Sequence, residues 1–215
     1  RIPVKDNLLS MHQFGAKWKH KEGWAKFVEN LKISDENGKN LSFEPLENAK
    51  WKIVDDFSGD VFLNYEVDFE FALEKWEPGN EQAAYFEDNT LFSVTKALFI
   101  ISKETNQSIV SFNLPDDWRV TTPWDSVAEN SNKFLARNAT ELINNSVVVG
   151  KQGVYSFKQD NFTYTLAQIG TMKESEKLMA EVMKKQLNAY KNLFGGLPKT
   201  NYLQVMFKGP EDGEA

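Results

Sequence analysis

The sequence contains no cysteine. Disulfides, thiolate nucleophiles and cysteine-based zinc sites are therefore excluded. The chain also has just two histidines, His12 and His20, and it contains no His-Glu-x-x-His motif, Gly-x-Ser-x-Gly motif or glycine-rich phosphate loop. The histidines lie eight residues apart, which is not the spacing that places two zinc ligands on one helix, and no set of additional ligands is apparent beside them. We therefore predict no catalytic residue and no metal site in this chain.

Long apolar runs and an excess of positive charge are missing too. No stretch approaches the roughly 20 apolar residues of a membrane-spanning helix, and the net charge is −6. Residues 16–27 do interleave lysines with aromatic side chains, as single-stranded nucleic-acid platforms do. The same pattern describes a strand with one buried aromatic face and one lysine face, and the acidic total favours this second interpretation. We expect neither a nucleic-acid partner nor a membrane span.

What the sequence does contain is the composition of strands and turns. Aromatic residues make up 13% of the chain, and Val, Ile and Thr are frequent between clusters of Asn, Asp and Gly. Residues 61–71 alternate between apolar and mostly polar side chains, which predicts a strand with one buried face. Hairpin turns are predicted at Asn37-Gly38 and at residues 159–161. Further strands are predicted at residues 97–102, 108–114, 119–122, 146–149, 154–158 and 162–169. This succession predicts a mainly β fold, either an antiparallel β-sandwich or a saddle-like sheet.

Near residue 170 the hydrophobic period changes from two to about 3.6. Thr171 and Glu174 have the spacing of a capping box, Gly195 or Gly196 supplies a C-terminal cap, and Pro198 prevents continuation of the helix. One arc of this helix is apolar and carries Met172, Met179, Val182, Met183, Leu187, Tyr190, Leu193 and Phe194. We therefore predict one long amphipathic C-terminal helix, followed by a short strand, whose apolar face needs a partner. A membrane-surface helix is the alternative, but its polar face would carry both signs of charge.

The order of these landmarks resembles the N-terminal region of the glycyl-aminopeptidase family of zinc metallopeptidases, and it also fits the broader aminopeptidase-N-like gluzincin group. The resemblance rests on residues 27–39, the alternating strand at 61–71, the Leu-Pro-x-x-Trp segment at 114–118, and residues 193–198 and 202–207. In that family the last helix and strand begin a thermolysin-like catalytic domain, and the preceding β domain forms a wall beside the substrate cleft. The resemblance therefore implies a β domain over residues 1–169 and the truncated start of a catalytic domain over residues 170–215.

The same resemblance implies a noncatalytic role for this chain. The family binds zinc on a His-Glu-x-x-His helix, which this chain lacks, so we expect no cofactor here and zinc in the catalytic domain of the parent protein. The expected partners are that missing catalytic domain, in the same polypeptide, and a peptide substrate of the parent. We expect the docking to use Met172, Met179, Val182, Met183, Tyr190 and Phe194.

Two further expectations follow from the resemblance. Gly213 and Glu214 are the only possible counterparts of a glycine-rich, Glu-containing segment at the edge of the family's cleft, where a carboxylate pairs with the α-ammonium group of a peptide. The resemblance, together with a first residue that is not Met, also points to an exported bacterial protein.

A different class of function stays open at this point. The chain would then be a standalone β-sandwich binding module for carbohydrate or protein, with Trp118 and Trp124 forming a surface on which a sugar ring stacks. Tryptophans beside turns are more often core anchors.

Overall fold

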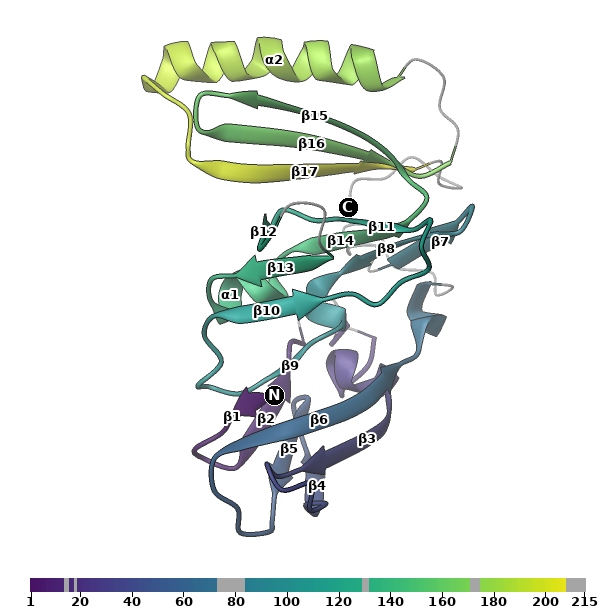
Figure 1. Ribbon diagram of the computed structural model, residues 1–215, viewed down its shortest axis with the longest axis vertical. Helices are drawn as coiled ribbons and strands as arrows, with labels where there is room; N and C mark the ends of the chain where they lie inside the picture. The colour runs from purple at the N-terminus through teal and green to yellow at the C-terminus, as the bar shows by residue number, and fades with distance from the viewer. Residues whose placement is uncertain (14–15, 18, 73–83, 129–131, 171–174, 208–215) are drawn as a thin grey trace.

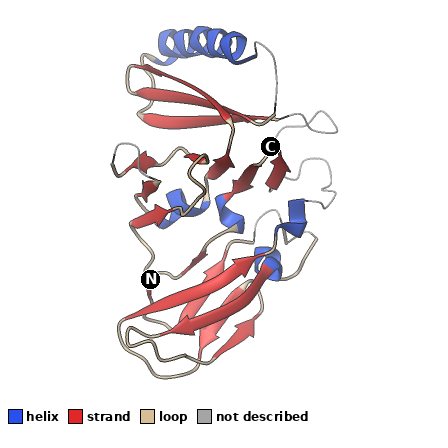
Figure 2. Cartoon of the chain, turned by 45° about the vertical axis from the view of Figure 1, so that its right-hand side comes forward, coloured by secondary structure: helices blue, strands red, loops and turns tan. Residues whose placement is uncertain are grey.

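The chain folds into three tiers of β-sheet stacked along its long axis, with one long helix closing the last tier (Figure 1). The computed structural model describes residues 1–13, 16–17, 19–72, 84–128, 132–170 and 175–207. Strands dominate these residues, and every strand pair among them is antiparallel except the last (Figure 2). The prediction of a mainly β fold that ends in a long helix and a strand is confirmed.

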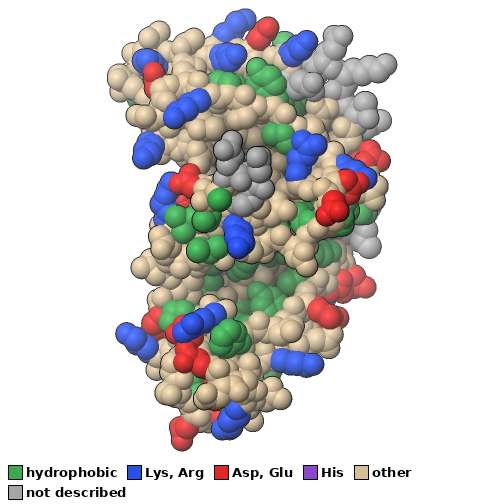
Figure 3. Space-filling view, in the orientation of Figure 1, with side chains coloured by type: hydrophobic (Ala, Val, Ile, Leu, Met, Phe, Trp, Pro, Cys, Tyr) green, Lys and Arg blue, Asp and Glu red, His purple; other side chains and the backbone are tan. Residues whose placement is uncertain are grey.

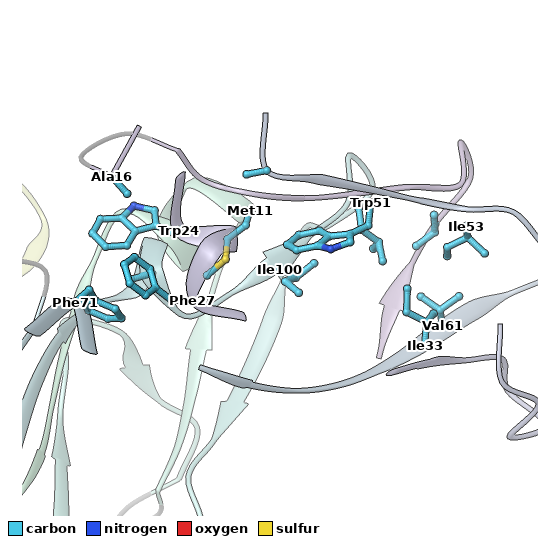
Figure 4. Close-up of a cluster of buried hydrophobic side chains, with 14 of the residues drawn as sticks. Met11, Ala16, Trp24, Phe27, Ile33, Trp51, Ile53, Val61, Phe71 and Ile100 are labelled. Carbon is cyan, nitrogen blue, oxygen red and sulfur yellow. The ribbon is translucent and has the colours of Figure 1, made fainter. Parts of the chain in front are cut away.

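The first tier is a sandwich of two sheets. One sheet has the order β1-β6-β3, from Ile2–Pro3, Asp60–Val67 and Val28–Ser34. The other has the order β4-β5-β2-β9, from Phe43–Leu46, Lys50–Ile53, Leu8–Met11 and Ile100–Ile101. Side chains of both sheets meet in one buried cluster, in which Ile33 and Val61 face Trp51 and Ile53 (Figure 4). This cluster is the largest hydrophobic core described in the chain.

Strand β6, at Asp60–Val67, confirms the predicted alternation up to Val67 but not the predicted extension of the strand to Phe71. Val61 is fully buried and its neighbour Phe62 is exposed, and the alternation continues to Val67. The strand ends there, because Phe69–Ala72 forms a short 3-10 helix, η2, that carries buried Phe71 into the core.

The hairpin predicted at Asn37-Gly38 forms, but its two arms pair with each other only next to the turn. Gly38 has a φ of 79°, and Ser34 and Asn40 form an isolated bridge across the turn. Beyond it, β3 pairs with β6 and β4 pairs with β5, so the two arms enter different sheets of the sandwich. Burial of each arm on its own side of the core overrides the local hairpin geometry.

Residues 16–17 and 19–27 are not a strand, which corrects the interpretation favoured for the segment 16–27. They form turns that lead into a 3-10 helix, η1, at Gly23–Phe27. Gly23 has a φ of 58°, which an extended strand does not tolerate. The aromatic residues Trp24 and Phe27 are nevertheless buried, and they pack with Phe71 through ring contacts. Burial of the aromatics was predicted correctly, and the local backbone was not.

The second tier also contains two sheets. Their orders are β11-β14-β8-β7, from Arg119–Thr121, Ser146–Gly150, Thr90–Val94 and Ala84–Glu87, and β10-β13-β12, from Ser108–Ser111, Lys133–Ala136 and Asp125–Ser126. Two short helices complete the tier, η3 at Thr95–Ala97 and α1 at Ala139–Ile143. Asn138 caps α1 by accepting a 2.8 Å hydrogen bond from the amide of Glu141.

The third tier is a three-stranded sheet with the order β15-β16-β17, covered by the helix α2. Its elements are Gly153–Gln159, Phe162–Gln168, Thr200–Met206 and Ser175–Phe194. The predicted turn between β15 and β16 is confirmed, with Asp160 at a φ of 52°. The C-terminal cap is confirmed as Gly195, which has a φ of 77° and donates its amide to the Lys191 carbonyl. The proposed capping box at Thr171 and Glu174 lies outside the described residues.

Two tyrosines lie at the interfaces on either side of the third-tier sheet. Tyr164 is fully buried on the side of α2, and burial raises its pKa from 10.0 to about 12. Tyr85 stacks on Phe207 at the interface with the second tier, with ring centroids 4.2 Å apart. Burial, with a 2.7 Å hydrogen bond to the Glu87 carboxylate, raises the pKa of Tyr85 to about 12 as well. Both rings are held as neutral phenols in the folded chain.

The passage from the second tier to the third is tight at Gly150. This residue ends β14 with a φ of 144° and lies in register with Thr90 of β8. A Cβ atom at this position would lie 2.6 Å from the Thr90 Cα, and closer still to the carbonyl oxygen of Asn89. Because both obstacles are backbone atoms, no side-chain rotation can relieve the clash.

We therefore expect Gly150→Ala to lower the free energy of unfolding by about 3 kcal/mol. Gly196→Ala is the matched control, since a Cβ there meets nothing within 4 Å, and it should change stability by less than about 0.5 kcal/mol. Urea unfolding of both variants measures the difference. Equal midpoints for the two variants would show that β8 and β14 separate easily at this point.

The two tyrosines also predict a pH dependence. The unfolded chain releases these protons near pH 10, whereas the folded chain keeps them up to a pH of about 12. Between these values the unfolded state binds fewer protons, so the free energy of unfolding should fall as the pH rises. Denaturant unfolding across this window should show a shallower fall for Tyr164→Phe than for the unsubstituted chain. Identical slopes would contradict the burial of the Tyr164 hydroxyl.

Candidate docking surface

The third tier is a β-α-β unit in which β16 and β17 run parallel. Their register is continuous from Phe162 opposite Thr200 to Gln168 opposite Met206. Two neighbouring parallel strands cannot be joined by a short turn, so the chain must cross over the sheet between them, and α2 is that crossover. The predicted boundary at residue 170 falls inside this unit, because β15 and β16 precede it while α2 and β17 follow it. The division at that residue itself stays a prediction.

One face of α2 packs on the upper face of this sheet. Leu187 is buried, and Met179 and Met183 are partly buried against Tyr164 and Leu166 of β16. These three helix residues are spaced by four, so they lie in one row along the helix. The packing fixes which side of α2 faces its own chain.

Polar contacts hold the adjoining flank of α2 to β15 and to the tip of the β15–β16 hairpin. Asn188 accepts a 2.8 Å hydrogen bond from the Gln159 side chain, and Lys191 forms a 2.8 Å ion pair with Asp160. The Lys184 ammonium lies 4.9 Å from the ring centroid of Phe157 on β15. The polar flank of α2 therefore faces β15.

The opposite flank of α2 is apolar and exposed. It consists of Leu178, Val182, Tyr190, Leu193 and Phe194, which we call the apolar flank, and these side chains are between 40% and 74% exposed. Leu178, Val182 and Leu193 recur at helical spacing on the side of the helix away from its polar flank, while Tyr190 and Phe194 pair at the C-terminal end with ring centroids 6.3 Å apart. In the space-filling view, hydrophobic side chains reach the surface among lysines in this tier (Figure 3).

Strand β17 carries a further exposed aromatic side chain, Tyr202. Tyr202 is 47% exposed and stacks on Tyr164 with ring centroids 6.2 Å apart. The Tyr164 hydroxyl, whose pKa is raised by burial, donates a 2.7 Å hydrogen bond to the Gln204 side chain. Tyr202 is therefore a further partly exposed aromatic side chain of this tier.

The lower face of β17 is anchored on the second tier. Leu203, Val205 and Phe207 pack in a cluster with Phe92 and Val148 of the second-tier sheet. At the start of the strand, the Asn201 side chain donates hydrogen bonds of 3.0 Å to the Pro123 carbonyl and 2.8 Å to the Asp125 carboxylate. Asp125 is in turn paired with Arg137, the residue that follows β13. The second tier therefore sets the position of β17.

The residues predicted to dock fall into two groups, one packed on the sheet and one on the apolar flank. Met179 and Met183 contact the sheet of their own chain, whereas Val182, Tyr190 and Phe194 lie on the apolar flank. Met172, Gly213 and Glu214 lie outside the described residues. Their roles, and the docking itself, stay predictions.

Leu178, which is 62% exposed on the apolar flank, was not among the residues predicted for the apolar arc. Its spacing from Val182 and Leu193 was the available signal, because residues four and fifteen apart share a helix face.

The histidines lie in ordinary surroundings. His20 packs edge-on against Phe27, with ring centroids 5.3 Å apart, and its Nδ1 lies 3.2 Å from the Lys26 ammonium. His12 borders a hollow of about 390 Å³ that Lys17 and Lys50 also line. Within the described ranges, no group of three or more His, Cys, Asp or Glu side chains could hold a metal ion.

The tryptophans proposed as a sugar-binding surface belong to a core. Trp124 is buried in the second tier, and its indole nitrogen donates a 2.9 Å hydrogen bond to the Glu141 carbonyl. Trp118 packs against the same cluster. The Trp124 ring is therefore not available for stacking on a sugar.

Surface charge and the hydropathy of the helices bear on two other expectations, namely that the chain has no nucleic-acid partner and no membrane span. On the face shown in Figure 3, acidic and basic side chains are interspersed rather than gathered by sign. None of the helices in the described part of the chain combines the length and the apolarity that a membrane crossing requires.

Solved structures share this fold. An aminopeptidase N family protein from Idiomarina loihiensis superposes with a TM-score of 0.72 at 17% identity, over 94% of this chain and 35% of that chain. Aminopeptidase A from Legionella pneumophila, solved in complex with aspartic acid, gives a TM-score of 0.51 at 8% identity over 93% of this chain and 24% of that chain. An M1 zinc metallopeptidase from Deinococcus radiodurans gives 0.47 at 13% identity over 95% and 49% of the two chains. This chain thus spans half or less of the length of each of these structures.

A comparison with curated proteins gave no match. A family model does match: residues 20–151 correspond to the model described as the Peptidase M61 N-terminal domain. The match confirms the resemblance to the N-terminal region of a peptidase family, and it covers the first tier from η1 onward together with the second tier through β14. Because more than half of the sequence is matched, the chain belongs to the family of peptidase M61 N-terminal domains.

Proposed function

We propose that this chain is the noncatalytic N-terminal part of a zinc metallopeptidase of the glycyl-aminopeptidase type. In this proposal it docks to the catalytic domain of the same polypeptide and forms one wall of the cleft that binds the peptide substrate. The observation that carries the proposal is the apolar flank of α2, which stays exposed although the opposite flank of the helix is already held by its own sheet.

The exposure of the apolar flank supports an interface better than it supports a free surface. Leu193 and Phe194 are 73% and 74% exposed, and they lie on the same helix as Leu178, Val182 and Tyr190. Isolated exposed apolar residues are ordinary on protein surfaces, but a continuous set on one element marks an interaction site. Burying a Leu or Phe side chain completely contributes about 1.5–3 kcal/mol. A partner that covers this flank therefore gains substantial hydrophobic stabilisation.

Membership of the family indicates which partner would cover the apolar flank. A peptidase N-terminal domain implies a catalytic domain in the same polypeptide, and the resemblance of residues 193–198 and 202–207 extends to the start of that domain. In the parent, zinc would be held there by a His-Glu-x-x-His helix and a later Glu, where the metal activates water for peptide hydrolysis. This chain supplies support and shape for the cleft rather than ligands or a general base.

Two neighbouring residues of α2 allow a test of the docking, because Met183 packs on the sheet of its own chain whereas Val182 lies on the apolar flank. In the chain as given, Met183→Asp should lower the thermal midpoint because it places a carboxylate against Tyr164 and Leu166. Val182→Asp should leave that midpoint within about 1 °C, because Val182 is 40% exposed. In a longer polypeptide that includes the catalytic domain, both substitutions should lower the midpoint, and Val182→Asp should do so by at least about 3 °C.

Lys185→Asp is the matched control, since Lys185 is exposed on the same helix turn and is not part of the apolar flank. It should have no comparable effect in the longer polypeptide. A longer polypeptide that tolerates Val182→Asp as well as it tolerates Lys185→Asp would contradict docking through the apolar flank.

A further inference from the structure

We propose that the hollow beside His12, between the first and second tiers, binds a small organic anion, a phosphate or a carboxylate, through the basic residues that line it. Its volume of about 390 Å³ is in the range of small-molecule sites. Residues of β2, β5 and β9 in the first tier line it together with a residue of α1 in the second tier. The inference goes beyond the proposed docking, because the described residues that line the hollow include none of α2 or β17.

Three residues that line the hollow form one row across the first-tier sheet. Lys50 of β5 lies opposite Ser10 of β2, and Ser10 lies opposite Ile101 of β9. Residues in register on neighbouring strands project from the same face of a sheet. The adjacent pair, Leu9 and Trp51, projects from the other face and is buried in the first-tier core. The hollow therefore lies on the outer face of this sheet.

The polar side chains that line the hollow can all donate hydrogen bonds, and two of them are cations. They are Ser10, His12, Gln13, Lys17, Asn48 and Lys50. Among the described residues that line the hollow, none is an aspartate or a glutamate. An ammonium group attracts an oxyanion, and hydroxyl and amide groups donate hydrogen bonds to it. This set of side chains fits a phosphate or a carboxylate, whereas it offers a cation no ligand of opposite charge.

The charge around the hollow is opposite to that of the whole chain. The chain carries a net charge of −6, whereas Lys17 and Lys50 contribute two positive charges to the lining. Both lysines are exposed, so a ligand in solution can reach them. A concave surface lined by one sign of charge raises the local concentration of ions of the opposite sign. An anion is therefore attracted to this position in spite of the acidic total.

Two apolar side chains of the hollow indicate that the anion has an organic part. Ile101 and Ile143 line the hollow and pack, partly buried, against the hydrophobic cluster of the second tier. A water molecule occupies about 30 Å³ in the liquid, so a lone phosphate group would leave most of the hollow to water. A ligand with an apolar body can place its charge beside the lysines and its body against the isoleucines. The lining favours such a ligand over an inorganic ion.

Nuclear magnetic resonance titration of the 215-residue chain tests the site. The probes are phenyl phosphate and benzoate, which join the same apolar ring to the two anionic groups, and benzyl alcohol, which has the ring without a charge. At an ionic strength of about 0.15 M, at least one anion should give saturable shifts in the amide signals of residues 10–13, 48–50, 101 and 143. Benzyl alcohol should not. The anion that saturates at the lower concentration identifies the chemical class of the ligand.

Substitution of the two lysines should remove the binding. Lys17→Gln combined with Lys50→Gln should weaken the binding of that anion at least about tenfold, because both charged donors are lost. Lys19→Gln combined with Lys52→Gln is the matched control. Lys19 and Lys52 are exposed in the same loop and on the same strand, but they are not among the residues that line the hollow. This control removes the same charge and should weaken binding less than about twofold.

The outcomes that overturn the inference are distinct. The absence of saturable shifts with both anions overturns it. Equal weakening in the two double variants assigns the effect to a general attraction between anions and lysines, and it overturns the site. Shifts concentrated in residues 178–194 place the probe on the apolar flank and overturn it as well. None of these results bears on the docking, which the substitution of Val182 tests separately.

A thermal measurement tests the same site without resonance assignments. A ligand that binds the folded chain raises its thermal midpoint by an amount that grows with ligand concentration. Phenyl phosphate or benzoate should therefore raise the midpoint of the unsubstituted chain and of the Lys19 and Lys52 control. Neither should raise that of the Lys17 and Lys50 variant. An equal rise in all three chains would contradict binding in the hollow.

Discussion

The third tier depends on the parallel pairing of β16 with β17. A parallel pair needs a crossover, and the chain supplies it with α2, which must therefore lie across one face of the sheet. Parallel sheets are stable when both faces are covered. Here α2 covers the upper face through Leu187, and the second tier covers the lower face through Phe92 and Val148. The position of α2 follows from this arrangement, and so does the division of its surface into a face held by the sheet and an exposed apolar flank.

The two flanks of α2 differ in their contacts within the tier. On the side of β15, a hydrogen bond, an ion pair and a cation–π contact fasten the helix to the hairpin. The opposite flank of the helix is apolar and exposed. A continuous exposed apolar flank is typical of an interface rather than of a solvent-facing surface, which is the basis of the proposed docking.

Local sequence signals predicted the individual elements of this fold better than they predicted which strands pair with one another. The alternation in β6, the turn at Asp160 and the cap at Gly195 depend on residues a few positions apart, and all three formed as predicted. The divergence of the chain after Gly38 depends on pairing with distant strands, which no local pattern encodes. In α2, Met183 and Val182 belong to the same predicted arc. Which of them faces the sheet was decided by the position of β16, and the sequence could not indicate that.

The central claim is that this chain supports a catalytic domain carried by the same polypeptide. The most direct test is to read the source gene beyond the codon for residue 215. The account predicts an open frame that encodes a His-Glu-x-x-His segment with a later Glu. A stop codon directly after residue 215 would contradict it, and the apolar flank of α2 would then have to be explained by a separate partner.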